Sequence, residues 1–320
     1  MNLEKTSGNS IKVIGVSKVS IPTLLHPKTP YFVLLLEDRQ GNKWAQKSIK
    51  EYKIGDNFEV EASQDKKAVA IFRIKYDILE AIEKITDLLG GIKISKNSRV
   101  LILPTLISPK HPYFCDNTSP QFLESAIQYL IEKGADLTNI RVLAQSFNET
   151  PIEASFQKSQ LFSVCLKNKI VSLDLAKSSF VKKGDLEISK EALDADFILN
   201  LPILKVGRAA ATVNLFQFLK KESYLEVKRL FPEKDLAEKL SEALPNCLTV
   251  AEALSVQKTT GLVGFLGLVL AGFDALNLDR VFAEISMVRP LPEALEKVKI
   301  DDIPIIGRNI LEVQYEIEKF

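Results

Sequence analysis

The feature of this sequence that most limits its fold is a change of hydrophobic period part-way along the chain. Residues 10–76 hold five short runs rich in Val, Ile, Phe and Tyr, separated by turn signals, which is typical of strands. From residue 98 to residue 320, apolar strand-like runs alternate with helical segments. This alternation predicts an α/β fold, with a mostly parallel sheet flanked by helices.

The first segment predicts a small five-stranded β-barrel of the OB type, because five short strands in about 65 residues suit a closed barrel. The fifth strand is expected within residues 68–76. Residues 77–92 carry apolar side chains at helical spacing and end at Gly90-Gly91, so a linking helix is expected there. The predicted organisation is a barrel over 1–76, a linking helix over 77–92 and an α/β domain over 93–320.

The charge of the chain argues against nucleic acid as its partner. Lys and Arg number 42 against 41 Asp and Glu, a formal net charge of +1. Strong nucleic-acid binders usually carry a basic excess. Residues 1–85 hold 14 basic against 11 acidic residues, so a weak basic surplus lies on the predicted barrel. An OB-type single-stranded nucleic-acid binder therefore stays open as one alternative function.

Cysteine and histidine are too scarce for common metal centres. The three cysteines form no CxxC pair and the chain has two histidines. An iron–sulfur cluster or a structural zinc site needs about four such ligands, so we expect neither and predict no cofactor. Scattered cysteines predict a cytoplasmic protein. The longest apolar run, residues 261–273, is shorter than the roughly 20 residues of a spanning helix, so we expect a buried strand and no membrane span.

An eleven-residue phrase occurs twice. Residues 22–32 recur as residues 104–114 with eight identical positions, and each copy holds one of the two histidines. One interpretation is two loops that share a ligand or a partner surface. The other, which we favour, is chance convergence of two proline-stiffened loops, because the copies stand in different structural contexts and nothing beside them matches.

Five segments of the second domain resemble, in their order, landmarks of the large family known as domain of unknown function 362. Those landmarks include an Asn-Thr loop before a helix, an Asn-x-Pro-Lys segment and a glycine-rich apolar strand followed by aspartates. The resemblance covers about residues 95–290 and implies an α/β domain. The matching segments are residues 101–108 (LILPTLIS), 117–120 (NTSP), 200–205 (NLPILK), 212–216 (TVNLF) and 267–274 (GLVLAGFD) with Asp279.

Several groups typical of that family are replaced in this chain. Leu103 and Thr105 stand where the family has Lys and Asn, Ile203 replaces a Lys, and Val206-Gly207 replaces a Thr-His pair. Many relatives also carry ferredoxin-like cysteine clusters, which three scattered cysteines cannot supply. The resemblance therefore implies the fold, and it implies no inherited activity.

The candidate ligand-binding residues lie on loops that follow predicted strands, because ligands of open α/β sheets bind beyond the carboxyl ends of strands. Lys205 and Arg208 lie on a glycine-containing loop and could hold a phosphate or a carboxylate. Polar side chains predicted to line the same crevice are Thr105, Asn117, Thr118, Thr212 and Asn214.

Asp274 and Asp279 are the candidate catalytic bases. Asp274 precedes a predicted helix, and helix capping explains its position well, so capping is the favoured interpretation. Asp279 lies within that helix and could pair with Arg280 or Lys205. An enzyme with one of these bases requires Lys205, Asp274 and Asn117 to converge on one pocket.

Three functions remain open from the sequence. The replaced Lys, His and Cys groups favour a protein that binds a small anion or a protein partner. The first alternative is an enzyme acting on a small anionic substrate (phosphate, carboxylate or acyl-CoA), with Lys205 and Arg208 as anchors. The second is the nucleic-acid binder named above. No sequence feature predicts an oligomeric state.

Overall fold

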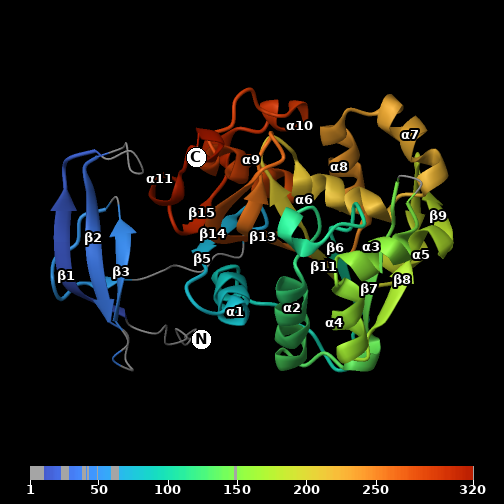
Figure 1. Ribbon diagram of the computed structural model, residues 1–320, viewed down its shortest axis with the longest axis horizontal. Helices are drawn as coiled ribbons and strands as arrows, with labels where there is room; N and C mark the ends of the chain where they lie inside the picture. Colours follow the sequence, from blue (N-terminus) through green and yellow to red (C-terminus); the bar gives the residue numbers. More distant parts are fainter. Residues whose placement is uncertain are drawn as a thin grey trace, which may run out of the picture.

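Figure 1 shows the computed structural model of the chain. The structure describes residues 11–22, 29–37, 41, 43–48, 50–58, 65–147 and 150–319. Its larger part is a mixed sheet with helices on both faces, and its smaller part is an antiparallel sheet built by N-terminal residues.

The large sheet contains nine strands in the described part of the chain, in the order β15-β5-β14-β13-β11-β6-β7-β8, with β12 paired to β13. β14 runs antiparallel to β5 and β13, while the other neighbours are parallel. Apart from β14, the strands therefore end at one edge, the carboxyl edge. They are β5 (Val69–Arg73), β6 (Val100–Pro104), β7 (Ile140–Ala144), β8 (Val171–Asp174), β11 (Phe197–Leu201), β12 (Ile203–Lys205), β13 (Cys247–Gln257), β14 (Val263–Gly272) and β15 (Ile305–Gly307).

Helices cover both faces of this sheet. In β6, Leu101 and Leu103 join the core on one face and Ile102 joins the core on the other, as the period of a strand requires. Coverage on both sides explains why the strands read as continuous apolar runs. On the Ile102 face lie α1 (Ile78–Leu88), α2 (Pro120–Glu132), α3 (Ile152–Lys158) and α4 (Leu161–Lys167). On the opposite face lie α5 (Lys190–Leu193), α6 (Ala210–Leu215), α7 (Lys221–Leu230), α8 (Glu233–Ala243), α9 (Ala275–Ile285), α10 (Glu293–Glu296) and α11 (Ile310–Val313).

The N-terminal sheet differs from the predicted barrel. Among the described residues it has four antiparallel strands in the order β3-β2-β1-β4, around a small core that includes Val13 and Leu34. In Figure 1 it stands at one end of the molecule. Its strands are β1 (Ile11–Val19), β2 (Tyr31–Glu37), β3 (Lys43–Ser48) and β4 (Asn57–Phe58).

The predicted fifth barrel strand, β5, belongs to the large sheet, where it pairs with β14 and β15. The five-stranded barrel is therefore wrong in this respect. Val69, Ala70 and Ile71 are all fully buried, because side chains on both faces of β5 join a core. A run that is apolar on both faces suits an inner strand of a covered sheet better than a strand of a small barrel.

The helix expected over residues 77–92 is α1. The Asp77 carboxylate accepts a hydrogen bond from Leu79 N at 2.9 Å and caps its start. Gly90 and Gly91 have positive φ and follow its end. The helix packs against β5, β14 and α2, so it is an integral part of the layer on that face.

Within the described part of the chain, every helix is too short or too polar to cross a bilayer. Most of the apolar run of residues 261–273 forms strand β14, which is buried from Leu266 onward as expected, whereas Val263 and Phe265 are exposed.

Candidate functional site

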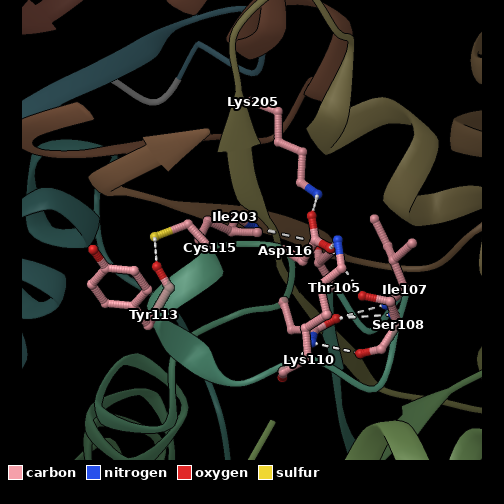
Figure 2. A network of polar contacts seen from close by, with 10 residues as sticks. Thr105, Ile107, Ser108, Lys110, Tyr113, Cys115, Asp116, Ile203 and Lys205 are labelled. Carbon is pink, nitrogen blue, oxygen red and sulfur yellow. Dashed lines mark hydrogen bonds and ion pairs between the residues drawn. The ribbon is translucent and has the colours of Figure 1, made fainter. Parts of the chain in front are cut away.

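A cluster of charged side chains lies at the carboxyl edge, where β6 and β12 end (Figure 2). Lys205, the last residue of β12, points its ammonium at the carboxylate of Asp116, and the Nζ–Oδ1 distance is 2.9 Å. Lys110 donates to the other carboxylate oxygen at 2.5 Å, and the Ser108 hydroxyl donates to it at 2.9 Å. We call Ser108, Lys110, Asp116 and Lys205 the Asp116 cluster.

The cluster is buried at its centre and open at its rim. The side chains of Lys205 and Asp116 are 7% and 9% exposed, whereas Lys110 is half-exposed. Burial opposes the charged form of Asp116, but hydrogen bonds from Lys110 and Lys205 outweigh it and lower its pKa to about 2. Burial lowers the pKa of Lys205, an effect that the hydrogen bond with Asp116 partly offsets. The pair is therefore an ionised one.

Positively charged side chains outnumber negatively charged ones at the Asp116 cluster. Lys110 and Lys205 both pair with Asp116, and the charges of Arg208 and Lys110 lower the pKa of Lys205 by repulsion. Arg208 is exposed on the turn after β12, where Gly207 adopts a φ of +74°. A Cβ at Gly207 would lie 3.1 Å from the Thr259 side chain, so both the turn and the close approach require glycine.

The loop that carries Asp116 is held in shape by its own side chains. The Asn117 carbonyl oxygen accepts hydrogen bonds from Ile107 N at 2.8 Å and Ser108 N at 3.3 Å. Its amide nitrogen donates to Ser108 O at 2.8 Å. The Thr118 hydroxyl donates to Leu201 O at 2.6 Å and accepts from Thr105 N at 2.8 Å, which ties the loop to β11. Asn117 and Thr118 thus position Asp116.

A second layer of buried amides lies beneath the loop. The Thr105 hydroxyl donates to the Asn214 carbonyl oxygen at 2.9 Å, and the Gln217 amide donates to the same oxygen at 2.8 Å. The Asn214 amide donates to Leu103 O at 2.9 Å and to Asn200 Oδ1 at 2.8 Å. Thr105 and Asn214, predicted as ligand-binding residues, are therefore engaged by protein groups. Their contacts join β6, β11 and α6.

Each of the two candidate catalytic aspartates accepts hydrogen bonds from the first turn of a helix, Asp274 from α9 and Asp279, which lies within α9, from α6. Asp274 caps α9 and accepts from Asn277 N at 3.0 Å. It follows β14, the strand that runs in the reverse direction, so it lies at the edge of the sheet opposite Lys205. Fully buried Asp279 accepts from Ala211 N at 2.9 Å and Thr212 N at 2.8 Å, which fixes the start of α6. The structure does not bring Asp274 together with Lys205 and Asn117, as the predicted enzyme requires.

Glu252 is a buried carboxyl that the sequence reasoning missed. It lies on β13, is 3% exposed, and accepts a hydrogen bond from Ser119 N, at the start of α2, at 2.8 Å. Burial raises its pKa to about 7. Burial, and then the charge of Glu252, raise the pKa of the Cys115 thiol to about 11. The sequence could have singled out Glu252, because it lies inside an otherwise apolar strand and buried carboxylates without a cationic partner are rare.

The second copy of the repeated phrase forms the loop of the Asp116 cluster. His111 begins the short helix η1 (Pro112–Phe114), where its Nδ1 accepts from Tyr113 N at 3.2 Å. In the first copy, residues 23–28 lie outside the described residues, so a shared role for the two loops stays a prediction. Among the residues that the structure describes, no group of three or more His, Cys, Asp or Glu side chains is arranged to hold a metal ion.

A family model described as domain of unknown function (DUF362) matches residues 100–284, more than half of the chain. The chain belongs to the DUF362 family. No protein with a curated description matches the sequence. The DUF362 region begins with β6 and includes Asp116, Lys205 and Glu252, so the Asp116 cluster lies within the family domain. The N-terminal sheet, β5 and β15 lie outside the match.

Proposed function

We propose that this DUF362 protein binds a small anion at the Asp116 cluster. The observation that carries the proposal is the buried Lys205 ammonium, which shares one carboxylate with Lys110 while Arg208 lies close by. Three cations against one carboxylate leave positive charge uncompensated, and an anionic ligand relieves their repulsion. The position at the carboxyl edge of an α/β sheet is where such folds usually bind ligands.

The ligand contacts are expected to come from the rim. Lys205 is held by Asp116 below the surface, so it supplies a fixed positive charge. Lys110 and the exposed Arg208 have donors that reach solvent, and the planar guanidinium of Arg208 matches a carboxylate or phosphate group. The proposed ligand class is therefore a small carboxylate or phosphate compound.

Calorimetric titration of the full chain with acetate, citrate and inorganic phosphate at constant ionic strength tests the proposal. Arg208→Gln and Lys110→Gln are each expected to raise Kd about tenfold, because each removes a charge-assisted hydrogen bond. Lys220→Gln is the matched control, since Lys220 forms a partly exposed ion pair with Glu187 at 3.0 Å, outside the Asp116 cluster. Binding that is absent, or equal in the three variants and the unchanged chain, would refute the proposal.

A second candidate function, catalysis on the bound anion, is favoured by Glu252. A carboxyl whose pKa is raised to about 7 can take up and release a proton near neutral pH, which is what a general acid or base requires. Glu252 lies close enough to Cys115 to raise the pKa of its thiol, and Cys115 directly precedes Asp116. If the protein is an enzyme, Glu252→Gln removes the ionisation near pH 7 from its rate profile.

A further inference from the structure

A second group of cations lies at the same carboxyl edge, where β5 and β15 end. Arg73 is the last residue of β5, and Arg308 directly follows β15. The two strands are parallel neighbours, so their ends lie side by side. Lys75 follows β5, and Lys47 comes from β3 of the N-terminal sheet, where its Nζ lies 3.3 Å from Leu311 O. We call Lys47, Arg73, Lys75 and Arg308 the Arg308 cluster.

Arg308 is a buried guanidinium with few acceptors around it among the described residues. The residue is 9% exposed. In the described part of the chain its Nη1 lies 3.4 Å from Lys47 O and 3.9 Å from a carboxylate oxygen of Glu312. A guanidinium has five N–H donors, and these two long contacts leave most of its hydrogen-bonding capacity unused. Burying a cation with so little compensation is costly unless a further acceptor binds.

The neighbouring cations in the Arg308 cluster lower one another's pKa by repulsion. Burial lowers the pKa of Lys75 to about 8, helped by the charges of Arg308 and Lys84. Burial likewise lowers the pKa of Arg308 to about 10, which Glu312 opposes and Arg73 assists. Arg73 and Lys75 still reach solvent, so their donors are accessible to a ligand.

Carboxylates do not balance this charge among the described residues. Glu312 and Glu80 are the acidic side chains that oppose the lowering of the Arg308 and Lys75 pKa values, and Glu80 already pairs with Lys84. The cations that repel one another around Arg308 are Lys47, Arg73, Lys75, Lys84 and Arg308 itself. The surplus suits a ligand with more than one negative charge.

We propose that the Arg308 cluster binds the phosphate group of a small phosphorylated molecule. Two guanidinium groups at adjacent strand ends match the geometry of phosphate oxygens, which accept paired hydrogen bonds from arginine. A phosphate monoester carries close to two negative charges at neutral pH and a terminal diphosphate carries more, whereas a carboxylate carries one. β13 and β14 lie between β5 and β12, so this site is separate from the Asp116 cluster.

Titration of the full chain with pyrophosphate and with inorganic phosphate at constant ionic strength tests this proposal. Arg73→Gln removes one exposed donor and is expected to raise the Kd for pyrophosphate about tenfold. Arg308→Lys keeps the charge but loses the planar fork, and a similar weakening is expected. Arg141→Gln is the matched control, because Arg141 is an exposed arginine that pairs with Glu191 at 3.0 Å. It is expected to leave binding unchanged.

The variants of the two sites separate the two proposals. Pyrophosphate binding that survives Arg208→Gln but weakens in Arg73→Gln supports the Arg308 cluster, whatever the outcome at the Asp116 cluster. Binding that weakens in Arg208→Gln and is unchanged in Arg73→Gln overturns it. Binding of a single-stranded oligonucleotide with no response to pyrophosphate or phosphate also overturns it, since the ligand would then be a polymer.

Discussion

The Lys205 ammonium lies 2.9 Å from the Asp116 carboxylate, and both side chains are more than nine-tenths buried. One residue ends strand β12 and the other lies on the loop after β6, 89 residues away in the sequence. The pair therefore joins two parts of the carboxyl edge that are far apart in the sequence. Lys110 shares the same carboxylate, so the pair is one part of a charged network.

Removal of the Asp116 carboxylate is expected to destabilise the fold. Asp116→Asn keeps the size of the side chain but leaves Lys205 buried beside Lys110 without a counter-charge. Breaking a buried pair in this way costs about 3 kcal/mol, which urea unfolding measures. Glu187→Gln is the control, because the Lys220–Glu187 pair is only partly buried, so solvent screens it and its contribution is small. Similar losses in both variants would show that burial is not what makes the pair important.

Stability is expected to fall in acid between about pH 4 and pH 2. Burial raises the pKa of Asp116, but hydrogen bonds from Lys110 and Lys205 outweigh it and lower the pKa from 3.8 to about 2. A carboxyl whose pKa is lower in the folded state stabilises that state above its unfolded pKa. The contribution disappears as pH falls through the folded value. Melting temperatures across this range should fall less steeply in Asp116→Asn, and an unchanged slope would contradict the assignment.

Glu252 is expected to have the opposite effect. Burial raises its pKa from 4.5 to about 7, so the folded state holds a proton that the unfolded state releases. Stability attributable to this group therefore falls as pH rises from about 4.5 to about 7. Glu252→Gln keeps an acceptor for Ser119 N and should stabilise the protein at pH 8 by on the order of 2 kcal/mol.

Unfolding measured at pH 5 and pH 8 checks the Glu252 prediction. The difference between the two pH values should shrink in Glu252→Gln. It should not vanish, because burial also raises the pKa of Asp279 to about 7. A variant that is equally destabilised at both pH values would show that Glu252 is charged in the folded protein.

The two aspartates of α9 are expected to differ in their contribution to stability. Asp274→Ala removes one N-cap hydrogen bond and should cost about 1 kcal/mol. Asp279→Ala leaves the buried Ala211 N and Thr212 N without their acceptor and should cost about 2–4 kcal/mol. Urea unfolding of the two variants at about pH 4 compares them directly, because the raised pKa of Asp279 contributes little to the difference at that pH. A larger loss in Asp274→Ala would contradict the capping of α6 by Asp279.

The sequence pattern predicted most of the elements around the site. The buried strand before Thr105, the helix entry at Ser119 and Pro120, and the apolar strand β14 all follow from hydrophobic period and capping residues. The order of five short motifs led to the DUF362 family. These features are readable because each depends on side chains a few positions apart.

The candidate site was only partly predictable. Lys205 and Arg208 were predicted from their place after a strand, and Asn117 and Thr118 from their place before a helix. Asp116 was not predicted, because its neighbours in the sequence do not distinguish an aspartate that pairs with a lysine from one that is exposed to solvent. Asp274 was placed with Lys205 on the expectation of uniform strand direction, and reversal of β14 puts it at the other edge.

The sequence by itself determined the type and approximate limits of the strands and helices, the α/β class and the family, because local period and capping encode them. Only the tertiary structure decided that β5 leaves the N-terminal sheet, that Asp116 meets Lys205, and that Arg73 and Arg308 end neighbouring strands. The physical reason is that an apolar strand such as Val69–Arg73 can be buried in either sheet. Its partners, and every charge pairing that depends on them, are selected by packing between residues far apart in the chain.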